Sequence, residues 1–294
     1  MTLDQLRMLV QIEEKGSVLA AAEALFRTQP TVSVAIRKLE DELGLQLLSR
    51  ERYRATLTPA GQKFCQQARA ILQQADDLKI LADYMASGYE SELNIAIEAS
   101  CPMPFLLDIL KKIEKQYPQT QFNLMAENIY GALTRLKDGE ADIAVSPWFE
   151  DDTGLESFTL LHESMLAVAS PQFPPLLAGK PLDHESMKGA VQVIVKDSSR
   201  NPREKKIGVM EEGRHWLVND HYTKKEILLA GMGWGRLQNH LIRRELEEGK
   251  LVPLQIKRYE SALDIEIRVA RRLGAPAGPV ASELWQMFGD KVKG

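Results

Sequence analysis

The chain has 294 residues, of which 44% are hydrophobic and 27% charged, a composition typical of soluble globular proteins with two or three domains. Its formal net charge of −4 argues against a protein that coats a polyanion with its whole surface, but leaves room for one local basic surface. The acidic N-terminus does not resemble a secretory signal and no apolar run approaches the ~20 residues that span a bilayer, so we predict a cytoplasmic protein without membrane contact.

Two short helices are predicted at the start of the chain. Apolar residues recur at helical spacing over residues 3–15, and Gly16, which adopts positive φ without strain, suits the end of this helix. Ser17 can cap a second helix, VLAAAEAL, and its alanines would let another helix backbone approach closely.

Residues 28–43, TQPTVSVAIRKLEDEL, form the third predicted helix. Thr28 can cap it, and Pro30 lies in the first turn, where a missing N–H costs nothing. Four apolar residues recur at helical spacing and should face the core: Val32, Ile36, Leu39 and Leu43. The polar residues then face outward, and the three helices together indicate a helix-turn-helix.

A basic hairpin and a long helix are predicted next. In LQLLSRERYRATLTPAG, alternation places Arg50, Arg52 and Arg54 on one face of a strand, which indicates a two-stranded basic wing. Residues 59–87 then form a helix about 40 Å long. Its apolar stripe is longer than a small winged domain can cover, so it should pair with a second copy of the chain: Phe64, Ala68, Ile71, Leu72, Ala75, Leu78, Leu81, Ala82 and Met85.

The remaining two thirds of the chain alternate between strand and helix patterns. Strands are predicted over residues 92–100, 121–128, 141–147, 162–170, 190–197, 214–220 and 264–273. Helices are predicted over residues 104–117, 129–138, 221–233 with its closing turn, 238–248 and 279–291. Such alternation favours a mainly parallel sheet flanked by helices, with the last strand and helix returning to the first half.

Three blocks of the N-terminal part resemble, in order, the winged helix-turn-helix of LysR-type transcriptional regulators: GSVLAAAEAL, RTQPTVSVAIRKLEDELGLQLLSR and LTPAGQKF. Val18 and Leu48 stand where that family often has phenylalanine, which changes core volume and leaves the polar positions unchanged. The order of the later strands and helices is similar to the family's effector-binding part. The resemblance therefore covers essentially the whole chain.

The resemblance implies a multi-domain α/β protein. Its parts would be a winged helix-turn-helix at residues 1–58, a linker and dimerisation helix at 59–88, and a periplasmic-binding-protein-like effector domain at 89–294. That domain would have one lobe of about 91–163 and 268–294, and another of about 164–267. The implied function is a homodimeric or homotetrameric regulator without enzymatic activity, which binds double-stranded DNA and responds to a small-molecule effector. RNA polymerase is a further candidate partner.

The candidate DNA contacts lie at the start of the third helix and in the wing. Glutamine can pair with adenine, arginine with guanine, and short hydroxyl groups with phosphate. The alternative is an ordinary solvated helix face. The residues are Thr28, Gln29, Pro30, Thr31, Ser33, Arg37, Arg50, Arg52 and Arg54.

The candidate effector contacts lie where predicted strands end, since small ligands of α/β sheets bind outside the carboxyl ends of parallel strands. They are Ser100, Cys101, Asn128, Ser146, Lys196, Asp197, Ser198, Asn219 and Asp220. Lys196, helped by Arg200 or Arg203, could hold an anionic effector, or it could pair internally with Asp197. The alternative for the whole set is loop polarity or helix capping.

Other functions have weaker support in the sequence. A solute-binding or sensor protein that carries an N-terminal interaction module lacks a secretory signal, and a redox-responsive regulator would need Cys101 as a reactive thiol, against the alternative of an inert buried cysteine. The histidines show no metal-site spacing, and GMGWG lacks the spacing of a dinucleotide-binding motif and suits a structural turn. We predict no cofactor, and the identity of the effector stays open.

Overall fold

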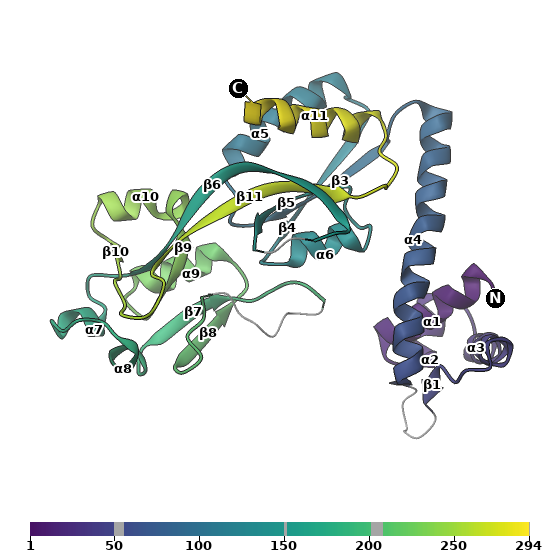
Figure 1. Cartoon of the computed structure of the whole chain (residues 1–294), viewed down its shortest axis with the longest axis horizontal. Coiled ribbons are helices and arrows are strands. Elements are labelled where there is room, and N and C mark those ends of the chain that lie inside the picture. The colour runs from purple at the N-terminus through teal and green to yellow at the C-terminus, as the bar shows by residue number, and fades with distance from the viewer. Residues whose placement is uncertain (50–55, 150–151, 201–207, 294) are drawn as a thin grey trace. The chain divides into compact units, whose positions relative to one another are not determined.

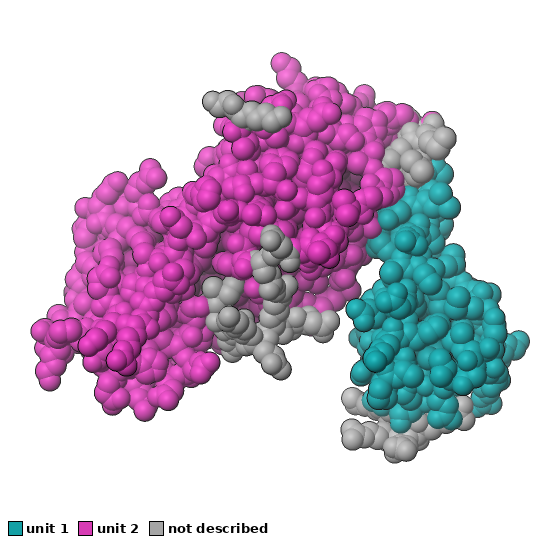
Figure 2. All heavy atoms as spheres, in the orientation of Figure 1, with its two compact units in different colours: residues 1–83 teal, residues 84–294 magenta. Residues whose placement is uncertain are grey.

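The structure is a computed structural model that describes residues 1–49, 56–149, 152–200 and 208–293. The chain forms two compact units, Met1–Asp83 and Tyr84–Gly294, which are described separately (Figure 2). The three wing arginines and Arg203 lie outside the described residues. No helix among the described residues is long and apolar enough to cross a membrane.

The first unit begins with the predicted helices, α1 (Leu3–Lys15), α2 (Val18–Ala24) and α3 (Gln29–Leu43) (Figure 1). A capping box between Thr2 and Gln5 starts α1, and Gly16 ends it with a φ of 69°. The Ser17 hydroxyl accepts the Ala20 N–H at 3.1 Å at the start of α2. The predicted caps at Gly16 and Ser17 are therefore confirmed.

A short antiparallel pair and the long helix complete this unit. β1 (Leu48–Ser49) pairs with β2 (Thr56–Leu57), and α4 runs over Pro59–Ser87. The core combines α1, α2, α3 and the first half of α4: Leu6, Leu9, Ile12, Ala21, Ala22, Val32, Ile36, Leu39, Cys65, Ala68 and Leu72. The apolar face predicted for α3 is confirmed, with Leu43 only partly buried at its end.

The second unit is built on one twisted sheet. Its strands follow the order β4-β3-β5-β11-β6-β9-β7-β8, with β10 paired to β6. Their bounds are β3 Glu92–Glu98, β4 Gln121–Glu127, β5 Ile143–Trp148, β6 Leu155–Ala169, β7 Val191–Val195, β8 Arg214–Val218, β9 Trp234–Gln238, β10 Val252–Pro253 and β11 Ala262–Arg272. Both ends of the sheet are parallel, whereas the long pair β6 and β11 in its middle is antiparallel.

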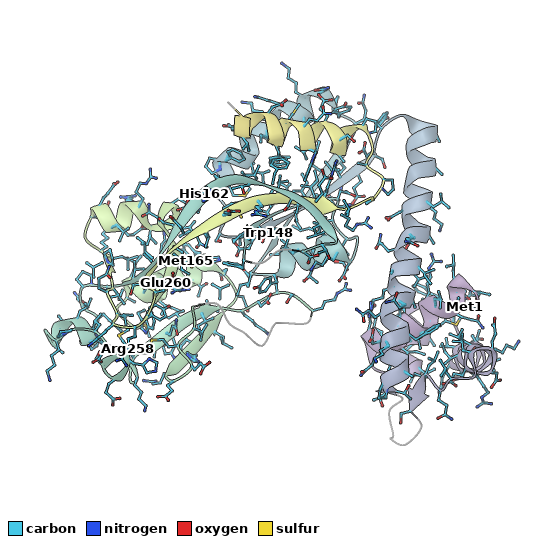
Figure 3. All side chains as sticks on the ribbon, viewed as in Figure 1. Met1, Trp148, His162, Met165, Arg258 and Glu260 are labelled. Carbon is cyan, nitrogen blue, oxygen red and sulfur yellow. The ribbon has the colours of Figure 1, made fainter. Side chains whose placement is uncertain are left out.

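The long β6/β11 ribbon joins two groups of elements. β5 pairs with the C-terminal half of β11, and β9 pairs with the C-terminal half of β6, so the two groups attach at opposite ends of the ribbon. We call β3, β4 and β5 with their helices the first lobe, and β7, β8 and β9 with theirs the second lobe. Trp148, at the end of β5, and Met165, on β6, follow one another along the ribbon from the first lobe toward the second (Figure 3).

Helices cover the sheet in both lobes. In the first lobe α5 (Met103–Gln116) and α11 (Pro279–Lys293) pack together with β3, β5 and β11, and α6 (Gly131–Lys137) packs on an alanine-lined surface of the same strands. In the second lobe α9 (His221–Leu229) and α10 (Asn239–Glu247) pack on β7 and β9, and α7 (Pro174–Leu177) and α8 (His184–Met187) are short. Buried Glu90 accepts the N–H groups of Val280 and Ala281 at 2.9 Å, which fixes the start of α11.

Three features of the sheet differ from the sequence prediction. The mainly parallel arrangement is wrong in the middle, because β6 and β11 pair along 155–166 and 262–272 in opposite directions. β6 begins seven residues before the predicted 162, since its first half is only partly buried and carries a mixed pattern. β9 was not predicted at all, because WGRLQ is buried at every position and shows no alternation.

Candidate functional site

The first turn of α3 is held by side-chain hydrogen bonds. The Thr28 hydroxyl accepts the Thr31 N–H at 3.4 Å and lies 2.8 Å from the Thr31 hydroxyl. Pro30 occupies the first turn, as the sequence predicted. These contacts fix the backbone at the end of the helix where candidate DNA contacts are concentrated.

The polar face of α3 is open to solvent. Thr28, Gln29, Pro30, Thr31 and Arg37 are exposed, and Ser33 is half-buried. Lys38 is exposed beside Arg37, which places two cations together on the helix surface. The helix can therefore present hydrogen-bonding groups and positive charge to a partner while its opposite face stays in the core.

Two residues near α3 matter for its position and were not singled out by the sequence analysis. Glu40 is buried, and its carboxylate accepts the N–H groups of Leu47 at 2.8 Å and Leu48 at 3.0 Å, which ties α3 to the start of β1. Phe26, in the turn between α2 and α3, has a φ of 53° and is 96% exposed. An acid on a helix is usually solvated, and a phenylalanine is usually buried, so neither residue type signalled its role.

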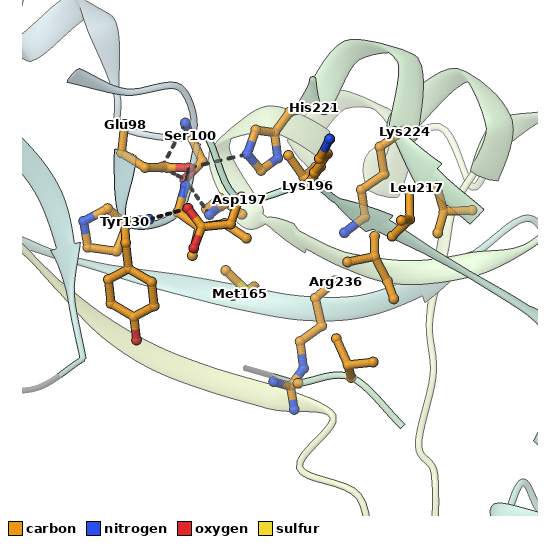
Figure 4. A pocket seen from close by; sticks show the side chains of 18 of the residues that line it. Glu98, Ser100, Tyr130, Met165, Lys196, Asp197, Leu217, His221, Lys224 and Arg236 are labelled. Atoms are coloured by element: carbon orange, nitrogen blue, oxygen red, sulfur yellow. Dashed lines mark hydrogen bonds and ion pairs between the residues drawn. The ribbon is translucent and has the colours of Figure 1, made fainter. Parts of the chain in front are cut away.

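A cavity of about 310 Å³ lies between the two lobes (Figure 4). Its apolar wall comes from both lobes and includes Ile129, Phe149, Met165, Val193, Val195 and Leu217. Ile129 has a φ of 56°, which is unusual for a β-branched residue, and its N–H points to the Glu98 carboxylate at 3.3 Å. Backbone strain of this kind clusters at ligand sites.

One side of the cavity carries two buried cations, Lys224 on α9 and Arg236 on β9 (Figure 4). The Lys224 side chain is 7% exposed, and its burial, followed by the repulsion of Arg236, lowers its pKa to about 7. Burial also lowers the pKa of Arg236. The Arg236 guanidinium donates to the carbonyl of Glu260 and lies 4.5 Å from the ring centroid of Tyr259. The backbone N–H of Lys224 donates to the Asp220 carbonyl at 3.3 Å, but no hydrogen bond or ion pair of its ammonium group is found within the described part of the chain.

The other side of the cavity carries a polar cluster of Glu98, Ser100 and His221 (Figure 4), to which Gln238 belongs through its contact with Ser100. The Glu98 carboxylate accepts the hydroxyl and, at 2.9 Å, the N–H of Ser100, and the Gln238 amide donates to the Ser100 hydroxyl at 2.5 Å. His221 Nε2 lies 3.5 Å from Glu98. Among the described residues, the buried Gln238 Oε1 and both His221 nitrogens have no hydrogen-bond partner.

The predicted effector residues divide into three groups. Ser100, Lys196 and Asp197 line the cavity, with Lys196 exposed. Asn128, Ser198 and Asn219 instead join the strand ends of the two lobes: the Asn128 N–H donates to the Ser198 hydroxyl at 2.9 Å, and the Asn128 amide donates to the Asn219 carbonyl at 2.7 Å.

The third group does not line the cavity. Asp220 caps α9 by accepting the Thr223 N–H at 2.7 Å, as the capping alternative expected. Ser146 is buried and donates to the Pro147 carbonyl at 3.1 Å. Cys101 packs in the core, its sulfur 3.7 Å from the Val145 carbonyl, and burial raises the pKa of its thiol. These surroundings favour the inert cysteine over the redox-responsive one.

The arginine suggested as a helper of Lys196 lies elsewhere. Arg200 pairs with Asp138 at 3.2 Å and with Glu140, and does not line the cavity. The sequence analysis also missed Lys224, although it lies four residues before the buried Leu228 and thus on the inward face of α9. Arg236 was missed together with β9.

Comparison with protein families matches both units. Residues 3–62 match the model described as "Bacterial regulatory helix-turn-helix protein, lysR family", and residues 86–293 match "LysR substrate binding domain". The chain is 29% identical over 274 residues to the probable HTH-type transcriptional regulator YhaJ of Escherichia coli (strain K12), covering 92% of this chain and 91% of that protein. It is 29% identical over 257 residues to the HTH-type transcriptional activator AllS of Klebsiella pneumoniae, covering 85% and 93%.

Similar solved structures span the whole chain. CbnR, a LysR family transcriptional regulator, has a TM-score of 0.59 at 20% identity and covers 100% of both chains. Its complex with target DNA has a TM-score of 0.57 at 20% identity, covering 99% of this chain and 100% of that one. LysG from Corynebacterium glutamicum with bound effector Arg has a TM-score of 0.52 at 21% identity, covering 99% and 98%. At these identities the likeness concerns the fold.

Proposed function

Since the chain belongs to the LysR family of transcriptional regulators, we propose that α3 binds operator DNA and that a small molecule in the inter-lobe cavity modulates this binding. The observation that carries the proposal is the pairing, in one chain, of a solvent-facing helix-turn-helix with a lined cavity of about 310 Å³. The family of the chain favours this function over a solute-binding or sensor protein.

The DNA-facing residues we propose are Thr28, Gln29, Pro30, Thr31, Ser33 and Arg37, together with the wing arginines Arg50, Arg52 and Arg54. Gln29 would read a base edge, and the hydroxyl groups and Arg37 would hold phosphates. The exposure of the α3 residues supports this assignment. The complex of CbnR with its target DNA supports it at the level of the fold.

A second copy of the chain is part of this proposal, because one helix-turn-helix reads only a few base pairs. On α4, Ile71 is 41% exposed and Leu78 68% exposed, and both lie on one face of the helix. We propose this face as the dimer contact. Leu72, in contrast, packs in the core of its own unit.

The effector domain would act by population shift. A ligand that prefers one arrangement of the lobes changes the balance of arrangements by at most its differential affinity. The effector-bound LysG supports a ligand site in this fold. Cytoplasmic action and contact with RNA polymerase belong to the same proposal.

Selection of bound duplexes from a random DNA pool tests the proposal. We expect the intact protein to enrich a partly palindromic sequence whose half-sites are one or more helical turns apart. Gln29→Ala should relax the preference at one or two base positions in each half-site, whereas a change at exposed Glu114 on α5 should leave the selected sequence unchanged. If the bound duplexes show no enriched sequence relative to the starting pool, the proposal is wrong.

A further inference from the structure

We propose that the ligand of the inter-lobe cavity is a small organic carboxylate, whose negative group is held by Lys224 beside Arg236 and whose apolar body lies on the wall formed by Val193, Val195 and Leu217. The inference rests on the proposed function, because it takes the ligand of this cavity to be the effector that modulates DNA binding. It adds the chemical class of the ligand and the residues that select it.

The ammonium group of Lys224 is the first reason. It is buried in the wall of a cavity, and no acid among the described residues approaches it. A buried charge without a partner is strongly destabilising, much more so than a buried charge paired with one of opposite sign. An incoming carboxylate supplies the missing partner.

The space around the two cations is the second reason. A Cβ atom on Gly235 would lie 2.8 Å from Lys224 Cε, and a Cβ atom on Gly208 would collide with the Arg236 guanidinium. Glycine at these two positions leaves room for the extended cationic side chains. The two glycines therefore allow both cationic side chains to lie in the wall of the cavity.

The acids of the cavity give the third reason, since they already have donors. Glu98 accepts from Ser100 and Ile129, and Asp197 accepts the N–H groups of Ser199 at 2.9 Å and Tyr130 at 3.3 Å. Lys224, in contrast, has three N–H groups to donate, and the buried Arg236 Nε has no partner among the described residues. On the side of the two cations, the unmet demand is thus for an acceptor with negative charge, whereas the unpaired Gln238 Oε1 lies in the polar cluster on the other side.

The apolar wall limits the ligand to a body with a single strongly charged end. A phosphate or sulfate would bring three or more oxygens and higher charge, for which the apolar wall offers no further donors. A carboxylate needs few donors and can be paired by one ammonium and one guanidinium edge. A cationic ligand would be repelled by both Lys224 and Arg236.

Thermal shift of the full-length protein with matched probes tests the class. The probes are acetate, hexanoate, benzoate, phenylacetate and succinate, the corresponding primary amides, and hexylamine and benzylamine, each at equal ionic strength. We expect at least one carboxylate with an apolar body to raise the melting temperature more than its amide, and neither amine to raise it. Equal stabilisation by acid and amide, stabilisation by an amine, or no stabilisation by any carboxylate overturns the proposal.

Matched variants of two neighbouring lysines locate the effect. Lys224→Met should weaken binding of the stabilising carboxylate about thirtyfold or more, because a buried charge partner is lost. Lys225→Met should leave it unchanged, since Lys225 pairs with Glu245 at 2.8 Å and does not line the cavity. Unchanged carboxylate binding in Lys224→Met overturns the assignment. The acid-against-amide comparison on the unsubstituted protein decides the class even if this variant fails to fold.

The outcome for DNA separates this inference from the proposed function. If the intact protein selects a palindromic DNA site and no carboxylate stabilises it, only the ligand class is wrong. If carboxylates bind and no DNA sequence is selected, the proposed function is wrong and the anion site stands.

Discussion

Lys224 is a cationic residue in surroundings that disfavour its positive charge. It is buried beside a second cation, and its pKa of about 7 lies below the 10.5 of an exposed lysine. The unfolded chain therefore binds more protons than the folded one between these pH values, and stability rises with pH across them. The destabilisation is fully present below about pH 7 and is lost as the pH approaches 10.5.

Lys224→Met should therefore raise the free energy of unfolding at pH 6.5 by a few kcal/mol, at roughly 1.4 kcal/mol for each unit of pKa shift. The advantage of the variant should shrink steadily toward pH 9.5. Chemical denaturation of the second unit's transition at several pH values measures this. Lys225→Met, which removes the ion pair with Glu245, should give no stabilisation, and a pH-independent advantage of Lys224→Met would contradict the account.

Phe26 stores strain in the turn that positions α3. Its φ of 53° is unfavourable for a side chain with a bulky Cβ substituent, and its exposed ring makes little compensating contact. Asparagine tolerates this conformation, so Phe26→Asn should stabilise the helix-turn-helix by about 0.5–1 kcal/mol. Amide hydrogen exchange of α1, α2 and α3 in the intact protein reports the change. Phe26→Ala should give clearly less protection than Phe26→Asn, because the alanine methyl group cannot form the local hydrogen bonds by which asparagine tolerates positive φ.

At the scale of the element, α4 has two apolar faces with different tasks. Cys65, Ala68 and Leu72 pack in the core of the first unit. Ile71 and Leu78, which lie about two turns apart on another face of the helix, are exposed. Sequence periodicity merged the two faces into one stripe. Among the described side chains of α4, Ile71 and Leu78 are the large apolar ones that are open to a second chain.

The double change Ile71→Asp and Leu78→Asp should therefore abolish the dimer and weaken operator binding at least tenfold, without changing any proposed DNA contact. Sedimentation velocity and gel shift on the selected duplex measure the two effects. Gln66→Asp with Ala70→Asp adds the same charge at exposed positions away from this face, and should leave the dimer intact. A double aspartate variant that stays dimeric and binds the operator as tightly as the parent would refute the assignment of this face.

At the scale of the whole molecule, the chain has a net charge of −4, and the DNA-binding surface proposed for it carries the cations Arg37, Arg50, Arg52 and Arg54. If a dimer neutralises about four to six phosphates, the logarithm of its binding constant should fall with the logarithm of salt concentration with a slope of about −4 to −5. Arg37→Ala should reduce the magnitude of this slope by about two for a dimer, since each copy loses one phosphate contact. Fluorescence anisotropy over a salt series provides the slope, and a salt-independent constant would exclude phosphate contacts.

Local sequence determined the elements of the first unit, because their signals act over a few residues. Thr28, Pro30 and Gly16 mark helix ends by capping and by backbone freedom, and Val32, Ile36 and Leu39 repeat with the period of a helix. The residues that face outward on α3 follow from the same period. The exposed ring of Phe26 and the buried carboxylate of Glu40 do not follow from it, since both depend on neighbours in other elements.

Only the tertiary structure decided how the cavity is lined. Of the residues predicted at strand ends, Ser100, Lys196 and Asp197 line the cavity, where polar residues gather because parallel strands finish there. Cys101 and Ser146 share that position in sequence but are buried away from the cavity. Ser146 lies within β5, where alternate residues point to opposite faces, and Cys101 lies in the turn after β3, where its side chain packs in the core. Lys224 and Arg236 come together because α9 packs on β9 within the second lobe, and no local pattern encodes that pairing.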